Sequence, residues 1–172
     1  GNMFTFGVKF IFPIQNTLKM ALPNIFNKEV SDQIVERINK LTPQSQPLWG
    51  KMNVAQMLAH NNVTYRYVHE PEQFKKPNFL MAWVLKSFVK KTVVSEVPYA
   101  KNTQTGPDFI IKDERNFETE KNNLISFIKR VQSEGEKTFE QRESFSFGKL
   151  SAVEWNNMFY KHIDHHLTQF GV

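Results

Sequence analysis

The chain has 172 residues, 40% hydrophobic and 23% charged, which is the composition of an ordinary globular protein with one core. It contains no cysteine, which excludes disulfides, thiolate metal ligands and a cysteine nucleophile; any metal site must therefore use histidine, carboxylate or water. The net charge is +5, but the lysines and arginines are scattered, which disfavours nucleic acid as a partner.

The first part of the chain predicts an irregular arm and two helices. Residues 1–23 are interrupted by two prolines and are expected to form an N-terminal arm. Apolar residues recur at helical spacing over 28–41, and a proline follows. A second helix is predicted from the cap residue Asn53 to His69, because Pro71 lies just beyond it.

The next part predicts a shorter helix over 79–94 and a long loop over 99–112. The 79–94 helix is apolar with three lysines, so it could suit a membrane surface. The alternative, which we favour, is a helix that covers the bundle or forms a homodimer contact. No stretch approaches the roughly 20 apolar residues that span a bilayer. We therefore expect a homodimer and no membrane partner, and the absence of cysteine fits a cytoplasmic protein.

The last part predicts two long helices. Apolar spacing indicates a helix over 117–134, and a polar, aromatic connection follows over 137–149. The final helix is predicted over 151–170, because Ser151 and Glu154 form a capping box.

These elements predict an all-α fold, since no convincing strand pattern is present. Four long helices with intervening loops favour a helical bundle. We expect a single domain over 24–172, with the 70–115 region inserted between the second and third long helices.

The final helix carries histidines on the face that should point into the core. At about 100° per residue, one sector of roughly 120° holds both apolar and polar side chains, namely Trp155, Met158, Phe159, His162, His166, Gln169 and Phe170. His162 and His166 are one turn apart, so both imidazoles can reach one ion at about 2.1 Å. The alternative is a pair of hydrogen-bonded core histidines. His165 lies at the edge of this sector, and Asp164 lies on the opposite side.

His60 lies on a semi-apolar face of the second helix and is a third candidate ligand. Gln56, Thr64 and Tyr67 share that face and could hydrogen-bond a metal ligand or a substrate. A hydrogen-bonded core role for His60 remains the alternative. His69 is about 180° away on the same helix, which predicts a surface position.

Two motifs carry a family resemblance. The segment Trp49…Val54-Ala-Gln-Met-Leu-Ala-His60 resembles the second-helix motif of the DinB-like (YfiT-like) superfamily. The run His162-Ile-Asp-His165-His166-Leu-Thr-Gln169 resembles its fourth-helix signature, His-x-x-His-His-x-x-Gln. The phrase Phe147-Gly-Lys-Leu-Ser-Ala-Val-Glu-Trp155 is similar to one subfamily of uncharacterised bacterial proteins. The resemblance covers about residues 24–172.

The resemblance implies a four-helix bundle that holds one divalent metal ion, with zinc or nickel as the usual expectation. The family's ligands map onto His60, His162 and His166, and not onto His165. Better-studied relatives resemble thiol-dependent transferases or isomerases, or metal-dependent hydrolases. A small-molecule substrate and a low-molecular-weight thiol are the partners that this resemblance implies.

Three neutral imidazoles would leave an open position on the ion. Bound water there would have its pKa lowered to about 7, and a substrate thiol would bind as thiolate. His165 and Gln169 lie nearest by helix geometry, and His165 is a candidate base, with a surface position as its alternative role. Two functions remain open: a metal-dependent transferase or hydrolase, and a non-catalytic metal-binding module, such as a stress-associated dimer.

Overall fold

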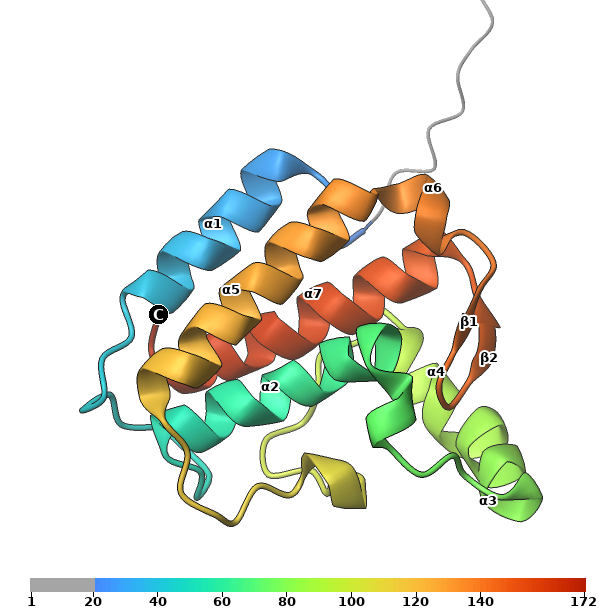
Figure 1. The fold of residues 1–172 in the computed structure, drawn as a ribbon, viewed down its shortest axis with the longest axis horizontal. Helices are drawn as coiled ribbons and strands as arrows, with labels where there is room; N and C mark the ends of the chain where they lie inside the picture. Colours follow the sequence, from blue (N-terminus) through green and yellow to red (C-terminus); the bar gives the residue numbers. More distant parts are fainter. Residues whose placement is uncertain (1–20) are drawn as a thin grey trace, which may run out of the picture.

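Four long helices enclose the core of the protein (Figure 1). The structure, a computed structural model, describes residues 21–172, so the predicted arm over 1–23 lies outside the described residues except for its last three. α2 contacts α5 and α7, and α1 contacts the same two helices. The long helices are α1 (Lys28–Asn39), α2 (Val54–His69), α5 (Phe117–Glu134) and α7 (Ala152–Gln169).

Capping residues that can be recognised in the sequence set the ends of these helices. Asn53 and Gln56 form a reciprocal capping box at the start of α2. The capping box predicted from Ser151 and Glu154 is confirmed at the start of α7. α5 ends at Gly135, whose φ of 76° lies in the left-handed region that favours glycine. The predicted positions of the long helices are therefore confirmed to within two residues.

Aromatic side chains fill one half of the interior. Phe159 lies at their centre, with its ring 5.1 Å from Tyr65 and nearly parallel to it. Trp155 stacks on Phe159 at 5.4 Å, and Phe139 meets both rings edge-on. All four side chains are fully buried. They anchor the first half of α7, so the second half of α7 carries its histidines at the other end of the core.

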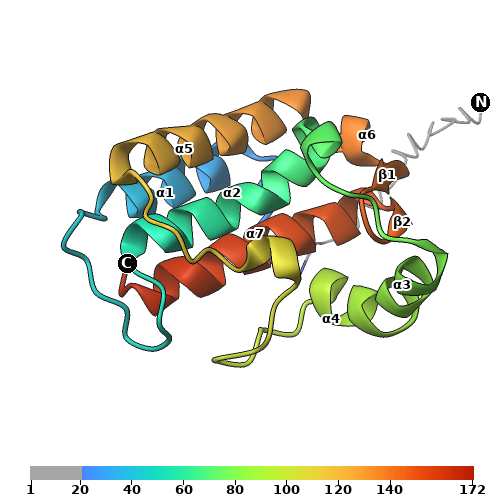
Figure 2. The same cartoon turned by 60° about the horizontal axis from the view of Figure 1, so that its bottom comes forward.

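The predicted insertion between the second and third long helices is confirmed. A short 3-10 turn, η1 (Pro71–Gln73), precedes three helical segments that follow one another without a break: α3 (Phe79–Val84), the π-helical η2 (Leu85–Val89) and α4 (Lys90–Val94). We refer to them together as the 79–94 helix. The loop that follows contains a second 3-10 turn, η3 (Pro107–Phe109). Figure 2 shows α3 and α4 on the side of α7 that faces away from α5. Within residues 21–172, no helix is both long and apolar enough to cross a bilayer.

A buried lysine on α7 holds the end of the 79–94 helix. The ammonium of Lys161 donates to the carbonyls of Thr92 at 2.7 Å and Ser95 at 2.5 Å. These carbonyls lie at the C-terminus of the helix, where a positive charge is stabilising. Burial lowers the pKa of Lys161 to about 8. The 79–94 helix is thus anchored at its C-terminal end.

The connection over 137–149 is not the strand-free segment that the sequence predicts. It contains the short helix α6 (Glu136–Phe139) and an antiparallel hairpin of β1 (Arg142–Ser144) and β2 (Gly148–Leu150). Each strand has three residues, too few for an alternating pattern to be recognised. The fold is therefore mainly rather than entirely helical.

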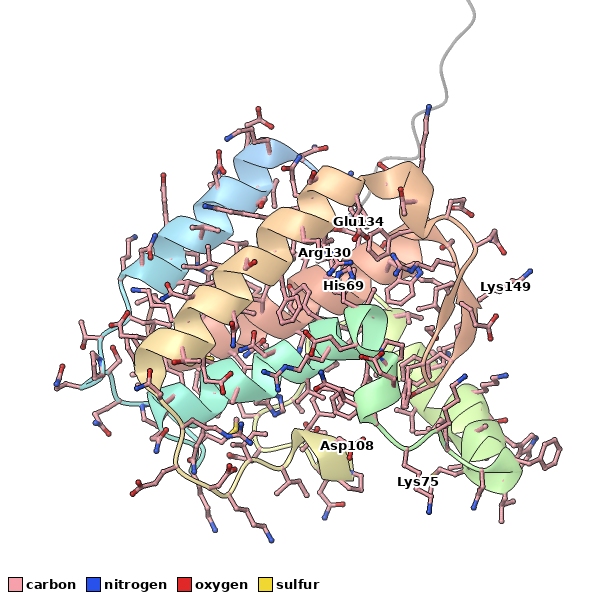
Figure 3. The ribbon with its side chains drawn as sticks, in the orientation of Figure 1. His69, Lys75, Asp108, Arg130, Glu134 and Lys149 are labelled. Atoms are coloured by element: carbon pink, nitrogen blue, oxygen red, sulfur yellow. The ribbon has the colours of Figure 1, made fainter. Side chains whose placement is uncertain are left out.

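The predicted surface position of His69 is wrong. Its side chain is fully buried, and its ring lies parallel to that of Phe127 at 5.9 Å. Both ring nitrogens lack a hydrogen-bond partner among the described residues, and Nδ1 is 3.6 Å from Glu134 Oε1. Figure 3 places His69 beside Glu134 and Arg130 of α5. α5 covers this face of α2, so both faces of α2 are buried.

We expect His69 to make the protein less stable in acid. Burial lowers its pKa to about 4, against the attraction of Glu134, whereas the unfolded residue titrates near 6.5. Between these values only the unfolded chain gains the proton, so stability is complete above about pH 6.5 and falls as the pH drops towards about 4. The free energy of unfolding should fall by about 1–2 kcal/mol over this range. This figure is reduced for solvent screening, because the charged neighbours of His69 are partly exposed.

Urea unfolding of the wild type and of His69→Phe, at several pH values across this window, measures the effect. Phenylalanine preserves the ring against Phe127 and removes two unpaired nitrogens, so the variant should lose less stability in acid. The other four histidines are common to both proteins and cancel in the difference. Parallel stability curves would show that His69 does not carry this dependence.

Candidate metal centre

Three histidines from two helices converge at one end of the core. α2 contributes His60, and α7 contributes His162 and His166. One ligand atom of each residue lies within 4.8 Å of the others. The ring centroids are 4.6–4.9 Å apart, and the Nε2 atoms of His60 and His162 are 2.9 Å apart. The helical spacing of His162 and His166 places both on one face of α7, and the packing of α2 against α7 brings His60 to them.

The far nitrogen of His60 is fixed by the main chain of the inserted loop. Its Nδ1 lies 2.8 Å from the carbonyl oxygen of Phe109. A carbonyl only accepts hydrogen bonds, so Nδ1 carries the proton and Nε2 presents its lone pair to the other histidines. The loop therefore orients this imidazole as a metal ligand requires.

His166 is oriented in the same way by Gln169. Its Nδ1 lies 2.8 Å from Gln169 Oε1, and the amide nitrogen of Gln169 donates to the Trp49 carbonyl at 2.7 Å. Because that carbonyl can only accept, the amide oxygen must face His166, and Nε2 of His166 is left unprotonated. A side chain at Gly50 would meet the same amide: a Cβ there would lie 2.6 Å from Gln169 Nε2. Gly50 is thus required for this close approach.

His162 differs from the other two because its partner is a hydroxyl. Its Nδ1 lies 2.9 Å from Thr64 Oγ1, which can donate or accept. Without an ion, Nε2 of His162 donates to His60, and Thr64 donates to Nδ1. A ligating His162 instead carries its proton on Nδ1, and the Thr64 hydroxyl accepts it. His162 can therefore change tautomer without losing its partner.

All three imidazoles are neutral at physiological pH. Burial, together with the neighbouring His60, lowers the pKa of His166 to about 3. Burial also lowers the pKa of His60, against the effect of the Phe109 carbonyl, and holds that of His162 well below its usual value. Metals bind the neutral imidazole, so no proton competes for the three nitrogens near pH 7.

These residues fit a divalent ion. Metal–nitrogen distances of about 2.1 Å in a tetrahedral site put ligand nitrogens about 3.4 Å apart, so the 2.9 Å separation has to widen only slightly. Imidazole donors suit zinc, nickel, copper and iron rather than magnesium or calcium. The three histidines could therefore hold a metal ion, with Thr64, Gln169 and the Phe109 carbonyl as their supports.

The three histidines lie at the wall of a large cavity. Its volume is about 1100 Å³, and its lining is mostly apolar, with contributions from α2, the 79–94 helix, the inserted loop, the hairpin and α7. His60 and His166 are buried, whereas His162 is partly accessible. An ion bound here would keep at least one position directed at this space.

The remaining predicted site residues lie around the cavity and not at the three nitrogens. Gln56 belongs to the capping box and donates to the Asp113 carbonyl at 3.3 Å. Tyr67 donates to Asp108 at 2.7 Å and stacks on Phe145. Both side chains line the cavity and hold the inserted loop and the hairpin against α2.

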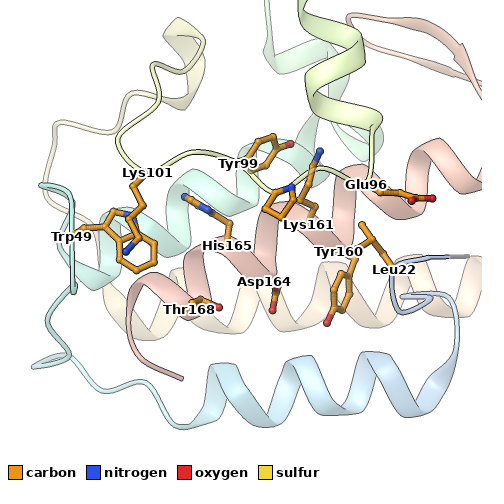
Figure 4. A pocket seen from close by; sticks show the side chains of 11 residues that line it. Leu22, Trp49, Glu96, Tyr99, Lys101, Tyr160, Lys161, Asp164, His165 and Thr168 are labelled. Carbon is orange, nitrogen blue, oxygen red and sulfur yellow. The ribbon is translucent and has the colours of Figure 1, made fainter.

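His165 does not join the metal-ligand group. In Figure 4 it lies on α7 between Trp49 and Tyr99, whose rings are 5.7 and 5.8 Å from its own. It lines both the large cavity and a smaller one of about 240 Å³. Its ring is 5.0 Å from that of His166. His165 is thus placed to contact a molecule in the cavity but not to complete the three-histidine group.

Three supporting residues escape sequence reasoning. Phe109 acts through its carbonyl, so its side-chain identity gives no signal. Trp49 also acts through its carbonyl, and Gly50 acts by having no side chain. Trp49 begins the second-helix motif of the sequence analysis, but the motif does not reveal the role of its carbonyl.

Comparisons with known proteins identify a family but no activity. The family described as "Protein of unknown function (DUF1569)" matches residues 25–171, which include every histidine of the centre. No curated protein and no solved structure matches the chain.

Proposed function

Because this chain belongs to the DUF1569 family of proteins of unknown function, which assigns it no activity, we propose from the site itself that it is a metal-dependent enzyme acting on a small molecule. The metal ligands are His60, His162 and His166. The observation that carries this proposal is the position of the three imidazoles at the wall of a cavity of about 1100 Å³. A purely structural zinc site has four protein ligands and is closed, whereas catalytic sites keep three and an open position.

The arrangement supports a nucleophile at neutral pH. A bound zinc or nickel ion would acidify water or a thiol in its open position. The protein's own contribution is to hold three neutral nitrogens in place and to exclude bulk water with the apolar cavity wall. His165, beside His166 and facing the cavity, is the residue best placed to exchange a proton with a molecule there.

We also propose that the four long helices form a DinB-like bundle. The two histidine motifs and the packing of α1, α2, α5 and α7 support this assignment. It favours a transferase that uses a low-molecular-weight thiol, or a hydrolase, as the reaction class.

A turnover panel tests the enzymatic part of the proposal. Metal-free protein, prepared without a histidine tag, is loaded with zinc or nickel and assayed for thiol conjugation and for ester and amide hydrolysis. We expect turnover that depends on the added metal and is absent from His166→Ala. Stoichiometric metal without turnover in any assay would contradict an enzyme and favour a non-catalytic metal-binding module.

A further inference from the structure

The 79–94 helix exposes an unusual amount of apolar surface. Of the eight large hydrophobic residues that are exposed in residues 21–172, five lie on this helix. The exposed fractions are 90% for Phe79, 68% for Leu80, 51% for Met81, 54% for Trp83 and 66% for Phe88. Val94 is the one buried residue of the helix. Apolar residues gathered in this way on a monomer mark an interaction surface.

The same segment is strongly basic. Five lysines and no acidic residue lie between Glu72 and Glu96. Lys90 is paired with Glu154, but Lys75, Lys76, Lys86 and Lys91 are exposed. Figure 3 shows Lys75, and Lys149 of the hairpin, extending outward near the end of the molecule that carries α3. A partner that matches this surface offers apolar groups to the exposed hydrophobic residues and negative charge to the lysines.

We propose that the 79–94 helix docks the protein on an anionic lipid surface. Phenylalanine, leucine and tryptophan can enter the boundary between headgroups and acyl chains, while the lysines remain with the anionic headgroups. The helix lies at the periphery of the molecule in both views, so a flat surface can reach it (Figures 1 and 2).

A second copy of the chain fits this surface less well. A twofold contact places the same patch on both partners, so two positively charged surfaces would be brought together. Like charges brought together in this way oppose association. The charge thus favours lipid over the homodimer contact that the sequence suggested.

Docking would also orient the large cavity. Met81, Leu85 and Phe88 belong to the 79–94 helix and line that cavity. A helix in the lipid boundary therefore forms one wall of a space that leads to the three histidines.

Sedimentation of the full chain with vesicles tests the proposal. We expect binding to vesicles of equimolar phosphatidylcholine and phosphatidylserine, and much weaker binding to phosphatidylcholine alone. The triple variant Phe79→Ser/Trp83→Ser/Phe88→Ser should lower the partition coefficient at least about tenfold, because exposed aromatic side chains supply the apolar contact. Brominated lipid should quench tryptophan fluorescence in the wild type but much less in Trp83→Phe, which preserves an aromatic side chain.

Two matched pairs serve as controls. Leu80→Ser should weaken binding, whereas Leu48→Ser, which removes a leucine that is 71% exposed elsewhere, should not. Lys75→Glu/Lys76→Glu should weaken binding more than Lys40→Glu/Lys129→Glu, which makes the same change in net charge. Equal binding by the wild type and the triple variant would overturn the proposal. A second outcome would also overturn it: the wild type is a dimer in light scattering and binds neither kind of vesicle, and the triple variant is a monomer.

Discussion

Replacement of His162 by alanine should remove stoichiometric metal binding while the chain stays folded. His162 supplies one of the three candidate ligands found within residues 21–172. Its loss should therefore lower the metal affinity by more than the roughly 10–100-fold that is typical when a ligand loses its hydrogen-bond partner. His162 is only partly buried and faces the cavity, so its truncation should disturb packing less than truncation of His60. Elemental analysis and zinc titration calorimetry of untagged protein measure the change.

His165→Ala is the matched control for this prediction. It removes an imidazole from the same helix, one residue before His166, but outside the group of three. We expect it to bind metal with the stoichiometry of the wild type. Equal loss in both variants would point to general damage to α7, and full retention by His162→Ala would refute the assignment of ligands.

A second large effect is expected in thermal unfolding. A ligand that binds only the folded state at one hundred times its dissociation constant stabilises it by about 2.7 kcal/mol. For a domain of this size, that corresponds to a rise in Tm of about 5–10 °C. The unfolded chain does not hold the three histidines together, because His60 lies 102 residues before His162 in the sequence. Calorimetry with zinc, nickel or magnesium, followed by a chelator, measures the shift.

The choice of ion is itself a control. Zinc and nickel should raise the Tm reversibly, whereas magnesium, which prefers oxygen ligands, should not. His162→Ala should show little or no shift with any of the three ions. An equal shift with magnesium, or one that persists in the variant, would locate binding elsewhere.

The long helices were predictable because the spacing of apolar residues indicates their length and the capping residues indicate their ends. The histidine face of α7 was predictable for the same reason, since His162 and His166 interrupt an apolar stripe. The hairpin was not, because strands of three residues leave no periodic pattern. The sequence of α2 predicts a surface position for His69 because helices commonly bury one face, but α5 covers the face that carries His69. The hydrogen bond from His60 to the Phe109 carbonyl depends on the path of a loop, which no residue type encodes.

Gln169 connects the loop before α2 to the candidate metal centre. Its amide oxygen orients His166, its amide nitrogen holds the Trp49 carbonyl, and its own carbonyl accepts from the Leu48 amide. The segment around Trp49 cannot move without releasing the residue that orients a ligand. Allosteric coupling between two sites is reciprocal. If an ion bound by His166 changes the affinity of this loop for a second molecule, that molecule must change the affinity for the ion by the same factor.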